Sequence, residues 1–391
     1  MSGARLGRVL VLAVASSLAL AACAGGGGGG TTGGDVTSVK IGFMGDLTGE
    51  NSAIVIPPYN GAKMAIDEYN AKNPKVKIEL IKYDSQGKPE QATSLLAQAV
   101  NTDKIVALIG PAFSGESKAV GGTLEESKLP SISPSATGPG LGKNGWKYWH
   151  RVVANDEDQG PRVAEFLVTA KSPKKAFVLS DDQEYSVGIA EAVVKTFKDK
   201  GVEVETDKFS KDASDYSSTV TKVKAANPDV IFFGGYYAQG GRLLKQLRDN
   251  DVKTMFASGD GSLDQQLVTS AGADKAEGAV LACPCNIPTS GVTGTLKTFF
   301  DNYKKSAGTD PAIYATEGYD AATAYIKAIE AGKTTSEDIN NFLSTVNFEG
   351  VSKPIKFKSN GEPENASIFV YQVKGGVLKL LGPSASAKLE G

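Results

Sequence analysis

The chain has 391 residues, of which 41% are hydrophobic and 22% are charged. This is ordinary globular composition, and the length is sufficient for two domains. The 42 Lys and Arg residues nearly balance the 44 Asp and Glu residues, so the formal charge is -2. We therefore expect no nucleic-acid partner, and we interpret the charge runs as solvated faces.

The first 37 residues carry export signals. Arg5 and Arg8 precede an apolar segment, 9–20, that is shorter than the roughly 20 residues a membrane-spanning helix needs. We predict that residues 1–22 are a signal peptide. They end at Leu-Ala-Ala-Cys, which resembles a bacterial lipobox, in which Cys23 takes a diacylglyceryl group and becomes the mature N-terminus. The glycine-rich residues 23–37 are predicted to form a flexible tether.

From residue 39 the pattern alternates between strand and helix. The first series predicts strands at 39–44, 76–83 and 105–109 and helices at 61–70, 89–101 and 118–127. The second predicts strands at 175–180, 202–208, 229–235, 254–258 and 278–282, with helices at 187–200, 217–226 and 242–250. Helices at 295–306 and 314–331 are expected to return to the first unit. The fold class is therefore α/β, with two doubly wound, Rossmann-like lobes.

Three crossover segments are expected to join the lobes, near residues 152–159, 282–288 and 357–363. These crossings predict a first lobe of residues 38–153 plus 284–356, and a second lobe of residues 154–283 plus 357–391. A small ligand is expected to bind between them.

Hydroxyl residues follow two neighbouring strands of the first series. The buried run 105–109 ends in a polar loop, and Ser114, Gly115 and Ser117 then open the helix predicted at 118–127. The unpaired N–H groups of this helix start suit an anion. Residues 131–137 add hydroxyls and a proline-stiffened turn after the next strand. Both loops are expected to offer hydroxyls and amides to one ligand. The alternative is that they are ordinary connecting loops of an α/β protein.

Catalytic motifs are lacking. Gly115-Glu-Ser-Lys-Ala119 misses the last glycine of a nucleophile elbow. The single histidine, His150, lies in a strand-like run and is interpreted as structural. With one histidine and no phosphate-binding loop, we predict no enzyme, no metal and no cofactor. Cys283 and Cys285 could form a local disulfide or remain two packed thiols.

The alternation from residue 39 to about 381, with the loops around Ser114 and Ser135, resembles the leucine/isoleucine/valine-binding family of solute receptors for ABC importers. The resemblance implies the type I periplasmic-binding fold and a ligand that is a free amino acid. At matching positions, the hydroxyls of Ser114 and Thr137 would hold the ligand carboxylate, helped by the backbone N–H groups of Thr137 and of neighbours such as Ala136. The Ser135 carbonyl would face the ammonium.

The same resemblance assigns the rest of the pocket. Asp260 stands where the family carries a usually longer acidic residue that pairs with the ammonium from the second lobe. Aromatic walls are assigned to Tyr185, Tyr236 and Tyr314, with Phe113 beside Ser114. Ile54 stands roughly where relatives place another aromatic residue, a change that would widen the pocket.

We therefore expect a monomeric receptor, lipid-anchored on the extracytoplasmic side of the bacterial cell membrane. It would deliver a branched-chain or hydrophobic amino acid to the membrane-embedded permease of an ABC importer. One alternative is another small ligand, such as an amide, a urea-like compound or an aromatic acid. The other is a sensory domain of the same fold, which is less expected because no output segment follows the second lobe before Gly391.

Overall fold

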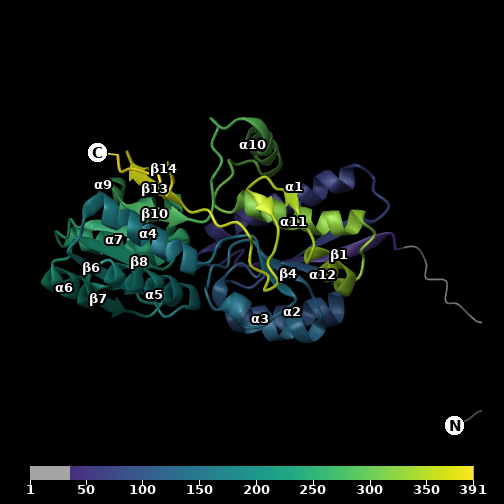
Figure 1. The fold of residues 1–391 in the computed structure, drawn as a ribbon, viewed down its shortest axis with the longest axis horizontal. Coiled ribbons are helices and arrows are strands. Elements are labelled where there is room, and N and C mark those ends of the chain that lie inside the picture. Colours follow the sequence, from purple (N-terminus) through teal and green to yellow (C-terminus); the bar gives the residue numbers. More distant parts are fainter. Residues whose placement is uncertain (1–35, 391) are drawn as a thin grey trace, which may run out of the picture. The chain divides into compact units, whose positions relative to one another are not determined.

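The computed structural model describes residues 36–390. The predicted signal peptide, Cys23 and most of the tether lie outside the described residues. The described part contains two large sheets, each with parallel strands and flanking helices (Figure 1). We call the five-stranded sheet with its helices lobe one and the seven-stranded sheet with its helices lobe two.

Lobe one is a parallel sheet in the order β2-β1-β3-β4-β5. Helices α1 and α11 cover one face, and α2 and α3 cover the other (Figure 1). Burial on both faces explains why a strand such as β3 is entirely apolar. The strands are β1 (Ser38–Gly45), β2 (Lys77–Asp84), β3 (Ala107–Ile109), β4 (Ser131–Ser133) and β5 (Trp149–Arg151), and the helices are α1 (Ile56–Ala71), α2 (Pro89–Gln98), α3 (Ser114–Ser127), α10 (Gly294–Ala307), α11 (Ala315–Glu330) and α12 (Ser336–Leu343).

Lobe two has the strand order β14-β13-β10-β9-β8-β6-β7. Five strands are parallel, and an antiparallel hairpin is added at the β10 edge. The strands are β6 (Lys175–Ser180), β7 (Glu203–Lys208), β8 (Val230–Gly234), β9 (Met255–Ser258), β10 (Val280–Cys283), β13 (Phe369–Lys374) and β14 (Val377–Pro383), and the helices are α4 (Asp156–Lys171), α5 (Glu184–Asp199), α6 (Ser217–Ala226), α7 (Tyr237–Asp249), α8 (Gln265–Ala271) and α9 (Ala273–Ala276). A short ribbon of β11 (Phe348–Glu349) and β12 (Pro354–Ile355) lies apart from both sheets.

Several elements were not predicted from the sequence, although local signals mark two of them. Helix α4 begins after Asn155, whose side chain accepts a hydrogen bond from the Glu157 N–H at 2.8 Å, as an N-cap does. The β13–β14 hairpin turns at Gly375 and Gly376, both with positive φ, and a Gly-Gly pair between apolar runs is a hairpin signal. Helix α12 was also missed.

The three crossings can be followed in the chain. The first occupies 152–155 because α4 starts at Asp156, and the second follows β10. The segment 357–363 still lies against lobe one, since Arg151 N–H donates to the Gly361 carbonyl at 3.0 Å. The third crossing therefore comes after Pro363, later than residues 357–363, because this hairpin-like segment first packs on the edge strand β5.

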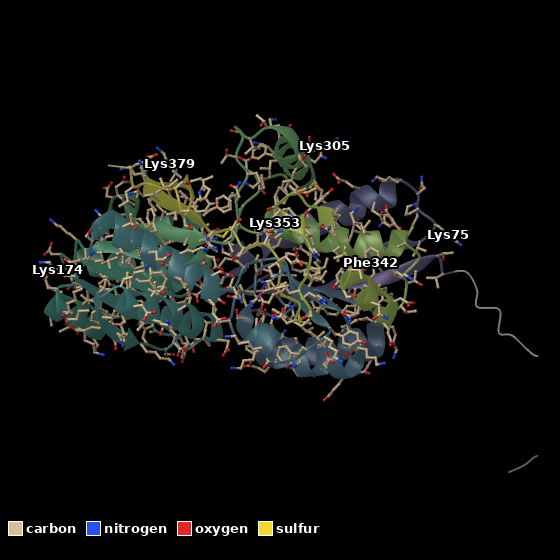
Figure 2. The ribbon with its side chains drawn as sticks, in the orientation of Figure 1. Lys75, Lys174, Lys305, Phe342, Lys353 and Lys379 are labelled. Atoms are coloured by element: carbon tan, nitrogen blue, oxygen red, sulfur yellow. A yellow bond between two sulfur atoms is a disulfide. The ribbon has the colours of Figure 1, made fainter. Side chains whose placement is uncertain are left out.

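Lys353 ties two of these crossings together. Its Nζ donates to the Val152 carbonyl at 3.0 Å and to the Pro284 carbonyl at 3.4 Å, and it pairs with Glu317 of α11 at 3.2 Å. Figure 2 shows Lys353 beside the segments that run between the sheets. In the second crossing, buried Cys283 and Cys285 form a disulfide. Lys353 thus links the first two crossings to each other and to α11 of lobe one.

Candidate functional site between the two lobes

A small cavity is lined by residues from both lobes. Its volume is ≈ 10 Å³, which is room for about one water molecule. Eight of the ten residues predicted to bind the ligand line it, and the other two, Ala136 and Thr137, are buried in the same loop as Ser135. The lining residues are Ile54, Ala112, Phe113, Ser114, Ser135, Tyr185, Tyr236, Asp260, Gly261 and Tyr314.

On the lobe-one side, the available hydroxyls can be identified from their partners. Ser114 Oγ accepts a hydrogen bond from the Gly138 N–H at 2.9 Å, which leaves its own hydrogen for a ligand. Ser135 Oγ donates to the Ala112 carbonyl at 2.7 Å and is used within the protein. Thr137 Oγ1 is buried and has no hydrogen-bond partner among the described residues. Ser114 is therefore the lining residue on this side with a hydroxyl hydrogen to offer, and Thr137 carries a second such hydroxyl in the adjoining loop.

The loop that carries Thr137 is held by Arg151. The Nη1 of this fully buried side chain donates to the carbonyls of Ala136 at 2.9 Å and Gly138 at 3.0 Å. The rest of the guanidinium forms a bidentate ion pair with Glu362. Sequence reasoning missed Arg151, because its partner Glu362 is 211 residues away.

On the lobe-two side, Asp260 follows β9. Its Oδ1 accepts from Gln159 Nε2 at 2.7 Å and from Tyr185 Oη at 2.8 Å, and its Oδ2 accepts from Tyr314 Oη at 2.5 Å. Burial raises the pKa of Asp260 above its ordinary value, and these three donors offset part of that rise. Because a carboxylate oxygen accepts about two hydrogen bonds, Oδ2 can still accept one from a ligand.

Tyr314 adopts an unusual backbone conformation. It precedes α11 with φ of 60°, in the left-handed region that non-glycine residues enter at a cost of about 1–2 kcal/mol. Such outliers cluster at functional sites, where the surrounding structure enforces them. Here the conformation accompanies a hydroxyl that reaches across from lobe one to Asp260.

The aromatic side chains form a continuous wall. The Tyr236 ring centroid lies 4.8 Å from that of Phe113 and 5.1 Å from that of Tyr185, so the wall spans both lobes. Gly261 permits this packing, because a Cβ there would lie 2.5 Å from Tyr185 Cε1. Ile54 is 2% exposed and completes the apolar side. An apolar group of a ligand would meet this wall.

Two polar residues next to Asp260 were missed by sequence reasoning. Gln159 donates from Nε2 to Asp260 and also to Asp156 Oδ1 at 2.8 Å, while its Oε1 accepts from the Asp260 N–H at 3.2 Å. Both Gln159 and Asp156 lie in the first turns of α4 and are fully buried. The N-cap and acidic first turn of α4 could have located the helix, but not the contact with a loop about a hundred residues later.

A wider cleft of ≈ 860 Å³ is lined by residues that include Phe113, Tyr185 and Tyr236 of the aromatic wall. Several residues of this cleft form contacts between the two lobes. The Glu50 carboxylate pairs with Arg242 and accepts from Gln239 Nε2 at 3.2 Å, and Lys118 of α3 pairs with Glu184 of α5 at 2.7 Å. The lobes are therefore in direct contact around the small cavity, as in a closed receptor.

Glu116 is a buried acid beside this cleft. Its Oε2 accepts from the Phe113 N–H at 3.0 Å and its Oε1 from the Ser85 hydroxyl, an arrangement that caps the start of α3. Burial raises the pKa of Glu116 to about 7. The group thus changes charge near neutral pH, one residue away from Ser117 and two from Ser114.

His150 has a structural environment. Its Nδ1 lies 3.3 Å from the Ser131 carbonyl oxygen, its ring packs on Phe357, and burial lowers its pKa to about 4. Within residues 36–390, no group of three His, Cys, Asp or Glu residues could hold a metal ion. No helix in that range combines the length and apolar character needed to cross a membrane.

Comparison with known families places the chain. Residues 38–377 match the family described as periplasmic binding protein. The chain belongs to this family. Its members are binding proteins and not enzymes, and this chain has their type I fold of two α/β lobes.

Relatives of this periplasmic binding protein are similar over most of their length. A Leu/Ile/Val-binding protein of Citrobacter freundii is 28% identical over 333 residues, which cover 83% of this chain and 88% of the relative. The structure of a leucine-binding protein of Thermotoga maritima has a TM-score of 0.82 at 29% identity and covers 88% of this chain and 98% of that one. A branched-chain amino acid transporter substrate-binding protein of Streptococcus pneumoniae, solved with isoleucine, has a TM-score of 0.80 at 26% identity, covering 90% and 99%.

Proposed function

We propose that this periplasmic binding protein is the receptor of an ABC importer and closes its two lobes on a branched-chain or hydrophobic amino acid. The proposal rests on one observation: a hydroxyl donor and a carboxylate acceptor face the same cavity from two sides. The Ser114 hydroxyl lines one side, with the buried Thr137 hydroxyl in the adjoining loop, and the Asp260 carboxylate lies on the other side. An α-amino acid presents a carboxylate and an ammonium that match these two sides.

The apolar wall supports a hydrophobic side chain. Phe113, Tyr185 and Tyr236 pack on one another, and Ile54 adds aliphatic surface. Two relatives are named as a Leu/Ile/Val-binding protein and a leucine-binding protein, and such apolar ligands suit an apolar wall. The cavity holds only about one water molecule. An amino acid such as leucine is larger, so the lobes must open and the wall must shift to admit it.

We also propose that lobe one comprises residues 38–153 plus 284–363 and that lobe two comprises the remainder from 154 to 390. The crossings at 152–155, after β10, and after Pro363 would then form the hinge. Scattering should show a smaller radius of gyration when the ligand saturates the protein. An identical profile with and without ligand contradicts closure.

A lipid anchor at Cys23 completes the proposed function. The Leu-Ala-Ala-Cys sequence supports it, and the protein would then be held at the extracytoplasmic face of the membrane beside the importer. Mass spectrometry of the mature N-terminus should show a diacylglyceryl group on Cys23 and no residues 1–22. An unchanged membrane fraction after Cys23→Ser contradicts this part of the proposal.

The ligand is tested by native mass spectrometry of the purified protein, followed by a thermal-shift screen of amino acids, amides and aromatic carboxylates. We expect the largest shifts with leucine, isoleucine or valine. Binding of an amide or a benzoate-like acid, with no response to amino acids, contradicts the ligand assignment and favours the alternative receptor class.

A further inference from the structure

Asp156 is a buried carboxyl group that the proposed ligand contacts do not use. Its Oδ1 accepts from Gln159 Nε2 at 2.8 Å, and its Oδ2 has no hydrogen-bond partner among the described residues. The same Nε2 donates to Asp260 Oδ1 at 2.7 Å. These two distances place the two Oδ1 atoms no more than about 5.5 Å apart. Two buried carboxyl groups this close strongly disfavour ionisation of both.

The surroundings supply little positive charge. Arg151 is the cation that acts most strongly on Asp156, and its charge is balanced by the bidentate Glu362. The titratable and charged groups around the pair, or around the tyrosines next to it, are Arg151 on β5 with its partner Glu362, Glu116 on α3, Asp181 after β6, Tyr185 on α5, Tyr236 before α7 and Tyr314 before α11. One proton is therefore expected on the pair.

The hydrogen bonds decide which carboxyl group carries it. Asp260 accepts from three side-chain donors, which stabilise its ionised form, whereas Asp156 has only Gln159 and the nearby Thr137 hydroxyl to do so. The ionised form of Asp156 is thus stabilised less than that of Asp260, so Asp156 is the group that holds the proton. Burial and the charge of Asp260 raise its pKa well above the ordinary value.

A proton on Asp156 also completes the hydrogen bonding of Thr137. The Asp156 N–H donates to the Thr137 carbonyl at 3.0 Å, and the Thr137 hydroxyl is close enough to lower the pKa of Asp156. Asp156 Oδ2 and Thr137 Oγ1 are both buried and unpartnered. A neutral Asp156 would donate to Thr137 Oγ1 and leave the threonine hydrogen for a ligand. An ionised Asp156 would take that hydrogen and place a second negative charge near the ligand carboxylate.

We propose that Asp156 is a neutral carboxylic acid and that its proton, donated to Thr137, turns the Thr137 hydroxyl hydrogen toward the ligand. The closed site can then bind the carboxylate of an amino acid as well as its ammonium group. Asp156 is a positioning residue in this scheme, because it acts through Thr137. The inference rests on the proposed function, since it assigns a role to one member of the same site.

Calorimetry with two probes tests the proposal. L-leucine carries both charged groups, and 3-methylbutylamine has the same side chain and ammonium without the carboxylate. In the wild type, leucine affinity should fall as the pH rises and Asp156 ionises, and the amine should not weaken in this way. Asp156→Asn keeps a donor in the same place, so it should bind leucine within about threefold of the wild type at mildly acidic pH.

At alkaline pH the Asp156→Asn variant should hold leucine more tightly than the wild type. Titration of the ligand ammonium affects both proteins equally and cancels in their ratio. Parallel pH profiles for the two proteins overturn the proposal, as does a uniform loss of leucine affinity in Asp156→Asn at every pH, which is what a merely structural role predicts.

Infrared difference spectra of the ligand-free proteins give an independent reading. The wild type minus Asp156→Asn should show the carbonyl stretch of a protonated carboxylic acid at neutral pH, and a carboxylate signal in its place overturns the proposal. If the wild type binds no leucine at any pH, the proposed function fails for this ligand, and the infrared band alone decides the state of Asp156.

Discussion

The Tyr314 hydroxyl donates a hydrogen bond to Asp260 Oδ2 at 2.5 Å, and this bond joins lobe one to lobe two inside the candidate site. Both side chains are buried, and Tyr314 is held in a left-handed backbone conformation. A ligand ammonium beside Oδ2 would therefore meet a carboxylate that is already oriented. A contact from lobe one thus helps to orient the carboxylate that lobe two contributes.

Asp260→Asn is predicted to discriminate between ligands. Hydrogen bonds to charged groups contribute about 1.5–3 kcal/mol, so leucine affinity should fall by about 10- to 150-fold. The deaminated analogue 4-methylpentanoate, which has no ammonium, should scarcely lose affinity if it binds at all. Calorimetry on both ligands measures this, with Asp274→Asn, an exposed site on α9, as the control. Equal losses for both ligands would mean that Asp260 supports the fold and not the ammonium.

Ser114→Ala is predicted to weaken both ligands, because each retains the carboxylate. Losing one donor to a charged group should reduce affinity by about tenfold or more. Ser127→Ala, at the other end of α3, removes a hydroxyl that bonds only to helix carbonyls and serves as the matched control. A Ser114→Ala protein with unchanged affinity for both ligands would remove Ser114 from the binding site.

Glu50→Gln is predicted to weaken ligand binding through the closed state. Glu50 lies in lobe one, and its partners Arg242 and Gln239 lie on α7 of lobe two. The pair is about half exposed, with side-chain exposures of 52% and 35%, so a loss of about two- to fivefold is expected, and less at high salt. Lys245→Gln on the same helix breaks an ion pair within lobe two and should leave affinity unchanged. A salt-independent effect, or the same effect in both variants, would argue against a latch.

The free energy of unfolding is predicted to depend on pH through the titration of Glu116. The folded-state pKa of about 7 is raised from the ordinary value of 4.5, so the folded protein binds this proton more tightly than the unfolded chain. The resulting stabilisation is present below about pH 4.5 and is lost as the pH rises through about 7. Relative to Glu116→Gln, the wild type should lose about 3 kcal/mol over this range.

Denaturant titrations of both proteins across the range measure the difference. Glutamine preserves the contacts with Phe113 and Ser85, since its amide can accept from the Phe113 N–H and donate to the Ser85 hydroxyl. A difference that stays constant with pH, or that grows in favour of the wild type at higher pH, would show that Glu116 is ionised throughout.

The sequence by itself determined the alternation of strands and helices, because the spacing of apolar residues and the runs of β-branched residues are local properties of the chain. It also placed hydroxyls after two neighbouring strands, and the family resemblance supplied the residues of the pocket. The boundaries of α6, for example, follow directly from this pattern. Helix α4 was missed although its N-cap is a local signal, and Pro161 inside the helix is a residue that argues locally against a continuous helix.

Only the tertiary structure decided the partners of the charged groups. Asp260 meets Gln159 across 101 residues, and Arg151 meets Glu362 across 211, and no local pattern encodes either pair. The left-handed backbone of Tyr314 is likewise enforced by its surroundings. Burial fixes the electrostatics of such groups, and burial is set by the packing of both lobes together. For that reason the sequence could indicate which residues line the site, but not which of them carries a proton or a charge.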